Sequence, residues 1–581
     1  MRPILSSKSD FQSEGHAMVK RKLLSIKLPR YFAVLRAIPL FDRLSYVLLL
    51  TLFGVFLLTF QHYGVTWDEP PQHAYGQMIL RYYKTFFEDR SALSYANLYY
   101  YGGFFDSLAA AAVRLSPLGL YETRHFLNGL FGILSVIGCF SLARLLAGAR
   151  AGFLALLIIC FSPAYYGHMF NNPKDIPFSA FYVWSVYYLV KFYLLMPTIP
   201  KSLIFKLGFS IGLTLSVRIG GLLLIAYLLL AVAAFLVPRC MKISSPSASL
   251  KSIALLAVSV FSICSISFGI MYLFWPWIHE NTFTRIFQAG ATMSRFHFFN
   301  GIVLFRGQML PATQLPPEYL SSCILIKLPE ITLFGLSVAL IILLSNLIKR
   351  RHENVMGHFK YLIVFVSITM PIVYALYNKS VLYDEMRHFL FIVPLVSAIS
   401  GVSLSIAYDY AQKARYKTYV MGGILGVYCA YQLLNMISLH PNQYIYYNMI
   451  VGGVKGAEGK YALDYWGNSY KEAAKELVRY LKKRDGAHFT ERRYRVAVCG
   501  PLHSAGYYFP ENIHLVKIEK EAEFYMSLNC LSCDTRRGGR DIIRITRLGA
   551  TLSIVRELAT SAAYGSENKR IVGSYLPKEN L

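Results

Sequence analysis

The stretch Leu203–Val237 reads LIFKLGFSIGLTLSVRIGGLLLIAYLLLAVAAFLV and decides how the chain is arranged. As one helix it would be roughly 50 Å long at about 1.5 Å per residue, whereas the hydrocarbon core of a bilayer is about 30 Å thick. A break at Arg218–Gly221 gives two spans, Leu203–Val217 and Ile219–Val237, with a charge at the turn between them. We therefore predict two membrane helices in this stretch.

Apolar runs of similar length lie on both sides of this stretch. We expect about eleven spans, at Leu44–Phe60, Phe126–Leu146, Ala151–Tyr165, Phe178–Leu195, Leu203–Val217, Ile219–Val237, Ile253–Trp275, Ile331–Leu347, Tyr361–Tyr377, Phe389–Tyr408 and Tyr419–Ile437. The composition agrees, because 55% of residues are hydrophobic and only 16% are charged, where soluble domains carry about 25% charged residues. The run that begins at Leu44 lacks a small-residue cleavage site and is expected to be an uncleaved span.

The net charge of +27 lies mainly in small groups between the apolar runs. With two spans in Leu203–Val237, the following groups all fall on the inner side: Arg144 and Arg150; Lys201; Arg239, Lys242 and Lys251; Lys349, Arg350 and Arg351; Lys413, Arg415 and Lys417. Short cytoplasmic loops of membrane proteins are rich in Lys and Arg. The charge therefore orients the protein in a membrane, and nucleic-acid binding is not expected.

This orientation divides the chain into three parts. Residues 1–43 form a basic cytoplasmic segment, residues 44–437 the transmembrane part, and residues 438–581 a soluble extracytoplasmic domain. Within the transmembrane part only two outer loops, 61–125 and 276–327, are too long to be turns. We therefore expect the activity at the outer face of the membrane, most simply the inner (plasma) membrane of a bacterium.

The soluble segments have their own patterns. In the first outer loop, apolar residues from Tyr75 to Phe87 recur at helical spacing, which is typical of a helix in the headgroup plane, and Ala96–Arg114 is expected to form a second one. The C-terminal segment is expected to be a small α/β unit, with a helix at Lys471–Lys483 and strands at Tyr494–Cys499, Asp541–Ile545 and Thr551–Glu557. Cys530 and Cys533 form a C-x-x-C pair that is a weak zinc signal without a second pair, and a disulfide is an open alternative outside the cytoplasm.

Two short polar motifs on the outer side could carry chemistry. Trp67–Pro71 reads WDEPP directly after the first span, and the plain interpretation is a helix start with Asp68 as the N-cap. Against this, two adjacent carboxylates at a membrane surface are unfavourable without a cation, a phosphate or a proton-transfer role. Asn171–Pro177 reads NNPKDIP between the third and fourth spans, where a simple polar turn is the alternative.

Basic residues lie on the same side. Tyr383–His388 reads YDEMRH at the outer end of the tenth span, where Arg387 could be a snorkelling side chain. Arg218, at an outer turn between spans, could likewise be either a site residue or a snorkelling side chain. Because all four positions fall on one membrane face, they indicate a site better together than any one of them does alone.

These motifs resemble those of a known superfamily, the membrane glycosyltransferases of the GT-C fold. The shared features are an Asp-Glu pair after the first span, a long first outer loop, an acid between spans three and four, an Arg before the tenth span and a soluble tail. The chain is most similar to the family 39 group of protein O-mannosyltransferases and the related aminoarabinose lipid A transferases, over roughly residues 44–470. Asn171–Pro177 and Asp464–Ser469 (DYWGNS) also look like segments of bacterial family 39 proteins.

The resemblance implies roles for individual residues. Asp68 would be the catalytic base, Glu69 its neighbour in the site and Asp175 a second acid. Arg387, together with Lys327 or His388, would hold the carrier phosphate, and Lys174 and Arg218 are further substrate-binding candidates. The implied reaction is the inverting transfer of one sugar from a polyprenyl-phosphate carrier to a lipid, glycan or protein acceptor.

A lipid-linked sugar flippase or transporter is the alternative function. Transporters carry ionisable residues near the bilayer midplane, often in inverted repeats, whereas the spans here are nearly free of Asp and Glu. The enzyme is therefore favoured. The expected partners are the lipid-linked donor, the acceptor and membrane lipids. We expect no cofactor and no bound metal, with a divalent cation left open.

Overall fold

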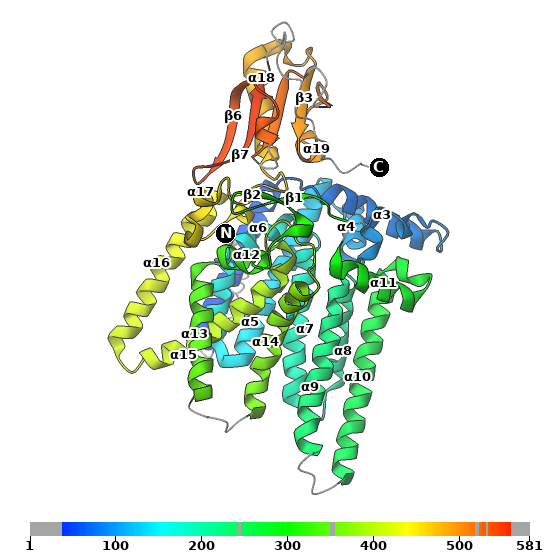
Figure 1. Cartoon of the computed structure of the whole chain (residues 1–581), viewed down its shortest axis with the longest axis vertical. Helices are drawn as coiled ribbons and strands as arrows, with labels where there is room; N and C mark the ends of the chain where they lie inside the picture. The colour runs from blue at the N-terminus through cyan, green and yellow to red at the C-terminus, as the bar shows by residue number, and fades with distance from the viewer. Residues whose placement is uncertain are drawn as a thin grey trace, which may run out of the picture.

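The computed structural model describes residues 38–240, 246–296, 298–348, 355–517, 522–529 and 533–558. The basic segment 1–43 lies mostly outside the described residues, as do Lys242, Lys349–Arg351 and Cys530. The described chain forms a long helical bundle with a small sheet domain at one end, and the C-terminal ends of α9 and α13 lie at the other end (Figure 1).

Long helices make up the bundle. They are α2 (Leu40–Thr59), α5 (Leu120–Cys160), α7 (Asp175–Leu195), α8 (Lys201–Leu215), α9 (Leu222–Cys240), α10 (Pro246–Phe274), α13 (Glu330–Ile348), α14 (Val355–Tyr377), α15 (Val393–Ala411) and α16 (Arg415–Leu439). Among the described residues, eight helices are long and apolar enough to cross a membrane, or nine if the bent pair Tyr319–Lys327 and Glu330–Asn346 is one span. The chain is thus an integral multi-pass membrane protein, but the expected count of about eleven spans is not confirmed.

The long helix α5 holds two of the expected spans. Its backbone leaves the helical region at Ala147 (φ −148°) and Gly148 (φ 85°). A Cβ built on Gly152 would lie 3.0 Å from Arg144 Cβ, although eight residues of straight helix would separate the two by about 12 Å. The chain therefore turns back on itself here. This fold-back and the 15-residue length of α8 explain why a count by helix length gives fewer spans than the sequence pattern.

The stretch Leu203–Val237 is divided as predicted. Helix α8 ends at Leu215, a short 3₁₀ turn covers Ile219–Gly221, and α9 begins at Leu222. Arg218 has an extended backbone (φ −146°, ψ 140°) at the break. The predicted split is confirmed, and it leaves the Arg218 side chain at the end of the bundle that faces the sheet domain.

A layer of short elements separates the bundle from the sheet domain (Figure 1). It contains α3 (Glu69–Lys84), α4 (Phe104–Leu115), α6 (Pro163–Asn171), α11 (Thr282–Arg295), α12 (Tyr319–Lys327), α17 (Gly453–Ala457) and the hairpin β1–β2 (Ile302–Phe305, Gln308–Pro311). The predicted helical stripe of the first outer loop is present in α3, but Tyr75 and Ile79 are each only 1% exposed. They pack against Ala92 and Leu98, so these stripe residues face the protein, because the loop after α3 folds back over them.

The C-terminal domain is a five-stranded mixed sheet with the order β4-β3-β5-β7-β6. Its elements are α18 (Tyr470–Asp485), β3 (Tyr494–Cys499), α19 (Leu502–Gly506), β4 (Ile513–Val516), β5 (Phe524–Leu528), β6 (Arg540–Arg547) and β7 (Ala550–Glu557). Strand β3 runs parallel to β4 and β5, and β7 runs antiparallel to β5 and β6. The predicted fold class, a helical membrane protein with a small C-terminal α/β domain, is confirmed.

The tail contains a disulfide that joins Cys533 to Cys499 at the end of β3, 34 residues away in the sequence. A Cys530–Cys533 bridge is therefore not formed. Neighbouring strands determine the pairing, because β3 and β5 are adjacent and Cys533 follows β5 in the chain.

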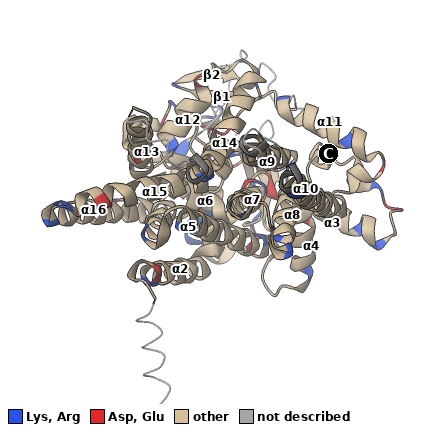
Figure 2. Ribbon diagram, turned by 90° about the horizontal axis from the view of Figure 1, so that it is seen from below, with Lys and Arg blue, Asp and Glu red and all other residues tan. Residues whose placement is uncertain are grey.

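Helix α16 stands apart from the other helices (Figures 1 and 2). Only two of its side chains, Gln432 and Leu439, are buried. Its outer half is fixed to the start of α13, where the Glu330 carboxylate accepts hydrogen bonds from Tyr428 Oη (2.9 Å) and Gln432 Nε2 (3.1 Å). The rest of the helix presents apolar side chains to the surroundings, which suits a lipid environment.

Candidate active site

A cluster of charged side chains lies where the bundle meets the layer of short elements. Its members come from four separate segments: the loop before α3 (Asp68), the start of α7 (Asp175), the α8–α9 break (Arg218) and the turn before α15 (Asp384 and Arg387). We call these five residues the Arg387 cluster. The four sequence positions that were expected on the outer side are therefore adjacent in space.

Arg387 is the centre of the cluster and is only 7% exposed. Its Nη2 lies 3.1 Å from Asp68 Oδ2, its Nη1 2.7 Å from Asp384 Oδ2, and its Nε 3.5 Å from Asp175 Oδ2. One guanidinium thus faces three carboxylates. Removing one partner of such a buried pair typically costs about 3–5 kcal/mol, so the cluster holds the four segments together as well as concentrating charge.

Asp175 is fixed by its own turn. Its backbone N–H donates to Asn172 Oδ1 (3.1 Å), and its carboxylate accepts from Asn172 Nδ2 (2.9 Å). The same carboxylate forms an ion pair with Arg218. The Asn-Pro-Lys-Asp motif is therefore more than a polar turn, since its acid links Arg218 to Arg387.

Aromatic rings and a further cation enclose the cluster. The Arg387 guanidinium carbon lies 4.9 Å from the ring centroid of Trp466 and 5.3 Å from that of Tyr383, and Lys174 Nζ lies 4.2 Å from the ring of Tyr101. Burial lowers the pKa of Lys174 to about 8, against the opposing effect of nearby carboxylates, first that of Asp68. Lys174 is thus a cation that loses its charge at a moderately alkaline pH.

Lys327 belongs to a neighbouring ion pair and does not contact the Arg387 cluster by a direct ion pair. It pairs with Glu385, lies 3.8 Å from the ring centroid of Tyr447 and donates to the Tyr444 carbonyl oxygen (3.3 Å). His388 lies beside the same turn, its ring 4.6 Å from that of Tyr383, and its buried Nδ1 has no hydrogen-bond partner among the described residues.

Asp68 and Glu69 are adjacent in sequence but face different surroundings. Asp68 occupies the N-cap position of α3, yet its side chain makes no capping hydrogen bond and pairs with Arg387. Its side chain is 29% exposed, the largest fraction among the three cluster carboxylates. The helix-start interpretation therefore explains its position but not the direction of its carboxylate.

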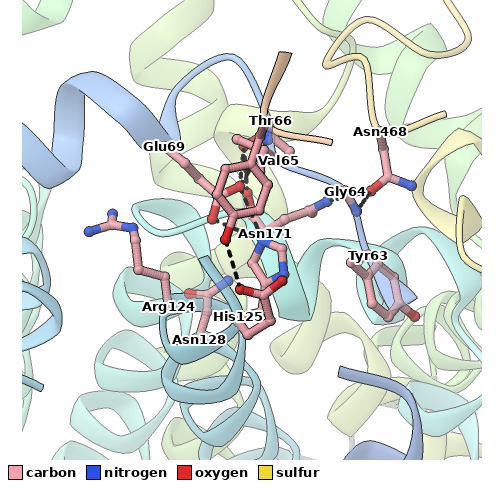
Figure 3. Close-up of polar contacts among 12 residues, drawn as sticks. Tyr63, Gly64, Val65, Thr66, Glu69, Arg124, His125, Asn128, Asn171 and Asn468 are labelled. Carbon is pink, nitrogen blue, oxygen red and sulfur yellow. Dashed lines mark hydrogen bonds and ion pairs between the residues drawn. The ribbon is translucent and has the colours of Figure 1, made fainter. Parts of the chain in front are cut away.

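Glu69 is buried and points toward Thr66 and His125 (Figure 3). Its Oε2 accepts from the backbone N–H of Thr66 (2.8 Å) and from Thr66 Oγ1 (3.1 Å), and its Oε1 lies 3.0 Å from His125 Nε2. Glu69 is 1% exposed. The contacts of Glu69 with Thr66 and His125 thus turn its carboxylate away from the Arg387 cluster.

The start of the tail is part of this framework. Asn468 Oδ1 accepts hydrogen bonds from the Gly64 backbone N–H (2.6 Å) and from Asn171 Nδ2 (3.1 Å), as Figure 3 shows for Gly64. Lys471 Nζ donates to the carbonyl oxygens of Gln61 and Tyr63. The Asp464–Ser469 motif thus joins the loop before Asp68 to the turn before Asp175.

Three residues in or beside the Arg387 cluster were not predicted as site residues, namely Asp384, Glu385 and Trp466. Asp384 and Glu385 lie within a motif that the sequence singled out, but their pairing with Arg387 and Lys327 was not anticipated. Trp466 likewise lay in a motif without an assigned role. Among the described residues, no three His, Cys, Asp or Glu side chains come together in a way that could hold a metal ion, and the expectation of no cofactor stays a prediction.

Residues 124–265, about a quarter of the chain, match the model of the family described as dolichyl-phosphate-mannose-protein mannosyltransferase. The resemblance predicted from the short motifs is thereby confirmed for this segment. A comparison with curated proteins finds no match.

Solved structures with a similar arrangement include an oligosaccharyltransferase and ArnT. The oligosaccharyltransferase of Archaeoglobus fulgidus is 13% identical, with a TM-score of 0.46, and the match covers 83% of this chain and 65% of that protein. ArnT from Cupriavidus metallidurans, bound to undecaprenyl phosphate, is 11% identical with a TM-score of 0.46, and the match covers 90% of this chain and 99% of that one. This chain therefore covers less than two thirds of the oligosaccharyltransferase.

Proposed function

We propose that this chain is an inverting glycosyltransferase that moves one sugar from a polyprenyl-phosphate carrier to a lipid, glycan or protein acceptor at the outer face of the membrane. The observation that carries the proposal is the convergence of Asp68, Asp175, Arg218 and Arg387 into one cluster from four distant segments. Such a concentration of acids and cations at the edge of a membrane bundle suits proton transfer beside an anionic group.

In this proposal Asp68 is the catalytic base. The acceptor oxygen attacks the anomeric carbon, its proton passes to the Asp68 carboxylate, and the bond from the anomeric carbon to the phosphate oxygen breaks, which inverts the configuration. The exposure of Asp68 supports this assignment, because a base must reach an acceptor that arrives from outside. Asp175, only 4% exposed, would act as a second acid that orients Arg218 and Arg387.

The departing phosphate needs cations. Arg387 can offer two parallel N–H groups to phosphate oxygens, and Lys327, Lys174 and Arg218 add positive charge nearby. His388 is a further candidate, since its ring nitrogen is free for a hydrogen bond. Glu69, by contrast, would act as a positioning residue that fixes Thr66 and hence the loop that carries Asp68.

A lipid-linked donor fits better than a nucleotide sugar. The description of the matching family names a dolichyl-phosphate sugar, which is a polyprenyl-phosphate donor. The sequence has no Gly-rich turn between a strand and a helix of the kind that cradles a diphosphate. A lipid donor could reach the cluster sideways from the bilayer, with its phosphate at the interface.

The proposed outer location has independent support from the tail. The Cys499–Cys533 disulfide suits an oxidising compartment, since cytosolic proteins rarely keep disulfides. A reporter that is active only outside the cytoplasm, fused near residue 560, should therefore be active. A silent reporter there, with a cytoplasmic reporter active at the same point, would refute the orientation.

The alternative of a flippase or transporter has less support. The Arg387 cluster lies at one end of the bundle, whereas transport sites usually lie near the bilayer midplane on interrupted helices.

The direct test is a transfer assay with purified full-length protein. It receives either a radiolabelled polyprenyl-phosphate sugar or the matching nucleotide sugar, with a cell-envelope extract as acceptor. We expect label transfer from the lipid donor only, and its loss in Asp68→Asn. Transfer from the nucleotide sugar without a lipid intermediate would refute the mechanism, and movement of the intact lipid donor across vesicles without transfer would favour the transporter.

A further inference from the structure

The turn that precedes Arg387 has an unusual backbone. Asp384 and Glu385 are consecutive and both adopt the left-handed conformation, with φ of 53° and 62°. Residues with a Cβ pay a free-energy cost in this region because the Cβ crowds the following carbonyl oxygen. The turn is held by hydrogen bonds from Glu385 N to Tyr319 Oη (3.0 Å) and from Arg387 N to the Asp384 carbonyl oxygen (3.2 Å).

This strained turn directs two adjacent carboxylates to two different cations. Asp384 Oδ2 lies 2.7 Å from Arg387 Nη1, and Glu385 forms an ion pair with Lys327. Arg387 and Lys327 are the residues proposed to hold the carrier phosphate. Each proposed phosphate ligand is thus already paired with an acid from the same short turn.

The acid–cation pairs at this turn leave some buried polar atoms without hydrogen bonds, which favours replacement of the acids by a phosphate. Glu385 is only 4% exposed, but its Oε1 has no hydrogen-bond partner among the described residues; Arg387 Nε also makes no hydrogen bond there, although it lies 3.5 Å from Asp175 Oδ2. Buried polar atoms without partners are costly. A phosphate offers more acceptor oxygens than one carboxylate and could satisfy Arg387 more fully.

The proposed reaction changes the charge of the group at this site. The sugar-linked carrier is a phosphodiester with one negative charge, and the spent carrier is a phosphate monoester whose second ionisation falls near pH 6. The product would therefore bind cations more tightly than the donor does. A site with cations alone would retain its own product.

We propose that Asp384 and Glu385 are tethered competitors of the carrier phosphate, which pair with Arg387 and Lys327 and so expel the spent polyprenyl monophosphate after each transfer. This inference rests on the proposed function and deepens it, because it assigns the product-release step to two named residues. The acids do not touch the anomeric carbon in this scheme. They set how long the product stays.

The protonation behaviour of the turn agrees with an exchange of partners. Burial raises the pKa of Asp384 and of Glu385 to about 7, against the opposing effects of Arg387 and Lys327 respectively. A carboxylate that a phosphate displaces from its cation can therefore take up a proton near neutral pH and avoid remaining as a buried unpaired charge.

The test measures binding of polyprenyl monophosphate to full-length protein in nanodiscs, without sugar or acceptor. We compare the wild type with Asp384→Asn and Glu385→Gln, and we expect each amide variant to bind on the order of tenfold more tightly, which is about 1.4 kcal/mol. Glu330→Gln is the matched control, because Glu330 bonds to Tyr428 and Gln432 and forms no ion pair within the described part of the chain, and the affinity of this variant should equal that of the wild type.

Two further measurements separate competition from a structural role. Asp384→Glu keeps the charge and should restore near wild-type affinity, and the amide variants should slow steady-state transfer while the first turnover stays fast. Asp384 is 20% exposed, so Asp384→Asn carries the test even if Glu385→Gln does not fold.

The outcomes distinguish this inference from the function on which it rests. If the wild type binds no polyprenyl monophosphate and transfers no sugar from the lipid donor, the proposed function fails and the inference fails with it. If the wild type binds and transfers, but Asp384→Asn binds the monophosphate no more tightly, the proposed function stands and the competitor role is overturned.

Discussion

Asp68 and Glu69 are neighbours in the chain, but their surroundings differ in almost every respect. Asp68 is 29% exposed and shares one guanidinium with Asp175 and Asp384. Glu69 is 1% exposed and has its two oxygens engaged by Thr66 and His125. A buried acid with satisfied hydrogen bonds stabilises a fold, whereas an accessible acid in a crowded ionic cluster is free to react. Two carboxylates that are adjacent in the sequence can therefore have different roles, because their surroundings differ.

The largest loss of transfer, and the clearest test of the difference between Asp68 and Glu69, is expected for Asp68→Asn. The amide keeps the size of the side chain but cannot accept the acceptor's proton, so transfer should fall by about 10²- to 10⁴-fold. The thermal unfolding temperature should fall only slightly, because Asp68 is the most exposed of the three carboxylates and Arg387 keeps Asp175 and Asp384 as partners. Transfer near the wild-type rate in this variant would remove the distinction between the two acids.

The second-largest loss of transfer is expected for substitutions of Arg387. Arg387→Lys keeps the charge but loses the planar fork, and we expect transfer to fall about tenfold or more, with a larger loss for Arg387→Ala. The measurement is the dependence of transfer rate on lipid-donor concentration. Equal rates for the wild type and Arg387→Lys would show that a point charge is sufficient and that the bidentate geometry has no role.

Glu69→Gln should lower stability and leave transfer nearly unchanged, which is the opposite of the result expected for Asp68→Asn. A glutamine would retain one acceptor oxygen but place an NH₂ group against either Thr66 or His125, which should cost about 1–3 kcal/mol of folding free energy. Thermal unfolding in detergent measures this loss. Transfer per folded molecule should stay close to that of the wild type, and a loss as large as that of Asp68→Asn, without destabilisation, would make Glu69 catalytic.

The smallest expected effect is a dependence on pH. Since burial lowers the pKa of Lys174 to about 8, its positive charge is present below that pH and is lost as pH rises through it. Donor affinity should therefore weaken above about pH 8, and Lys174→Arg, which stays charged, should move this decline to higher pH. A pH profile of kcat/KM for the lipid donor checks this, and identical profiles for both proteins would contradict it.

Much of the fold follows from the sequence because it depends on local pattern. The length of Leu203–Val237 and the charge at Arg218 suffice to divide it, and strand Tyr494–Cys499 has the predicted limits. Strands β4 and β5 were not predicted, since both are short and only their pairing with β3 gives them a place in the sheet. The partner of Cys533 was missed for the same reason, as spacing along the chain favours Cys530 and the sheet favours Cys499.

The residues of the candidate site were predictable from the sequence motifs, but which of them pair with each other was not. Asp68, Asp175, Arg218 and Arg387 were all identified by their place on one membrane face. The direction of Glu69 depends on His125, which lies at the start of α5 in an otherwise unremarked segment. The pairing of Glu385 with Lys327 depends on a turn in which Glu385 adopts the left-handed conformation, which is uncommon for residues with a Cβ.

The contacts of Asn468 and Lys471 mean that the soluble domain is not a detachable module. Asn468 holds Gly64 and Asn171, and Lys471 holds Gln61 and Tyr63, so the backbone that leads to Asp68 is shared by both parts of the protein. A truncation placed at the apparent border near Tyr470 would keep Asn468 but remove Lys471. Exchanging tails between related chains should therefore succeed only when the junction lies beyond Lys471, and a junction before Asn468 would disturb the loop that leads to Asp68.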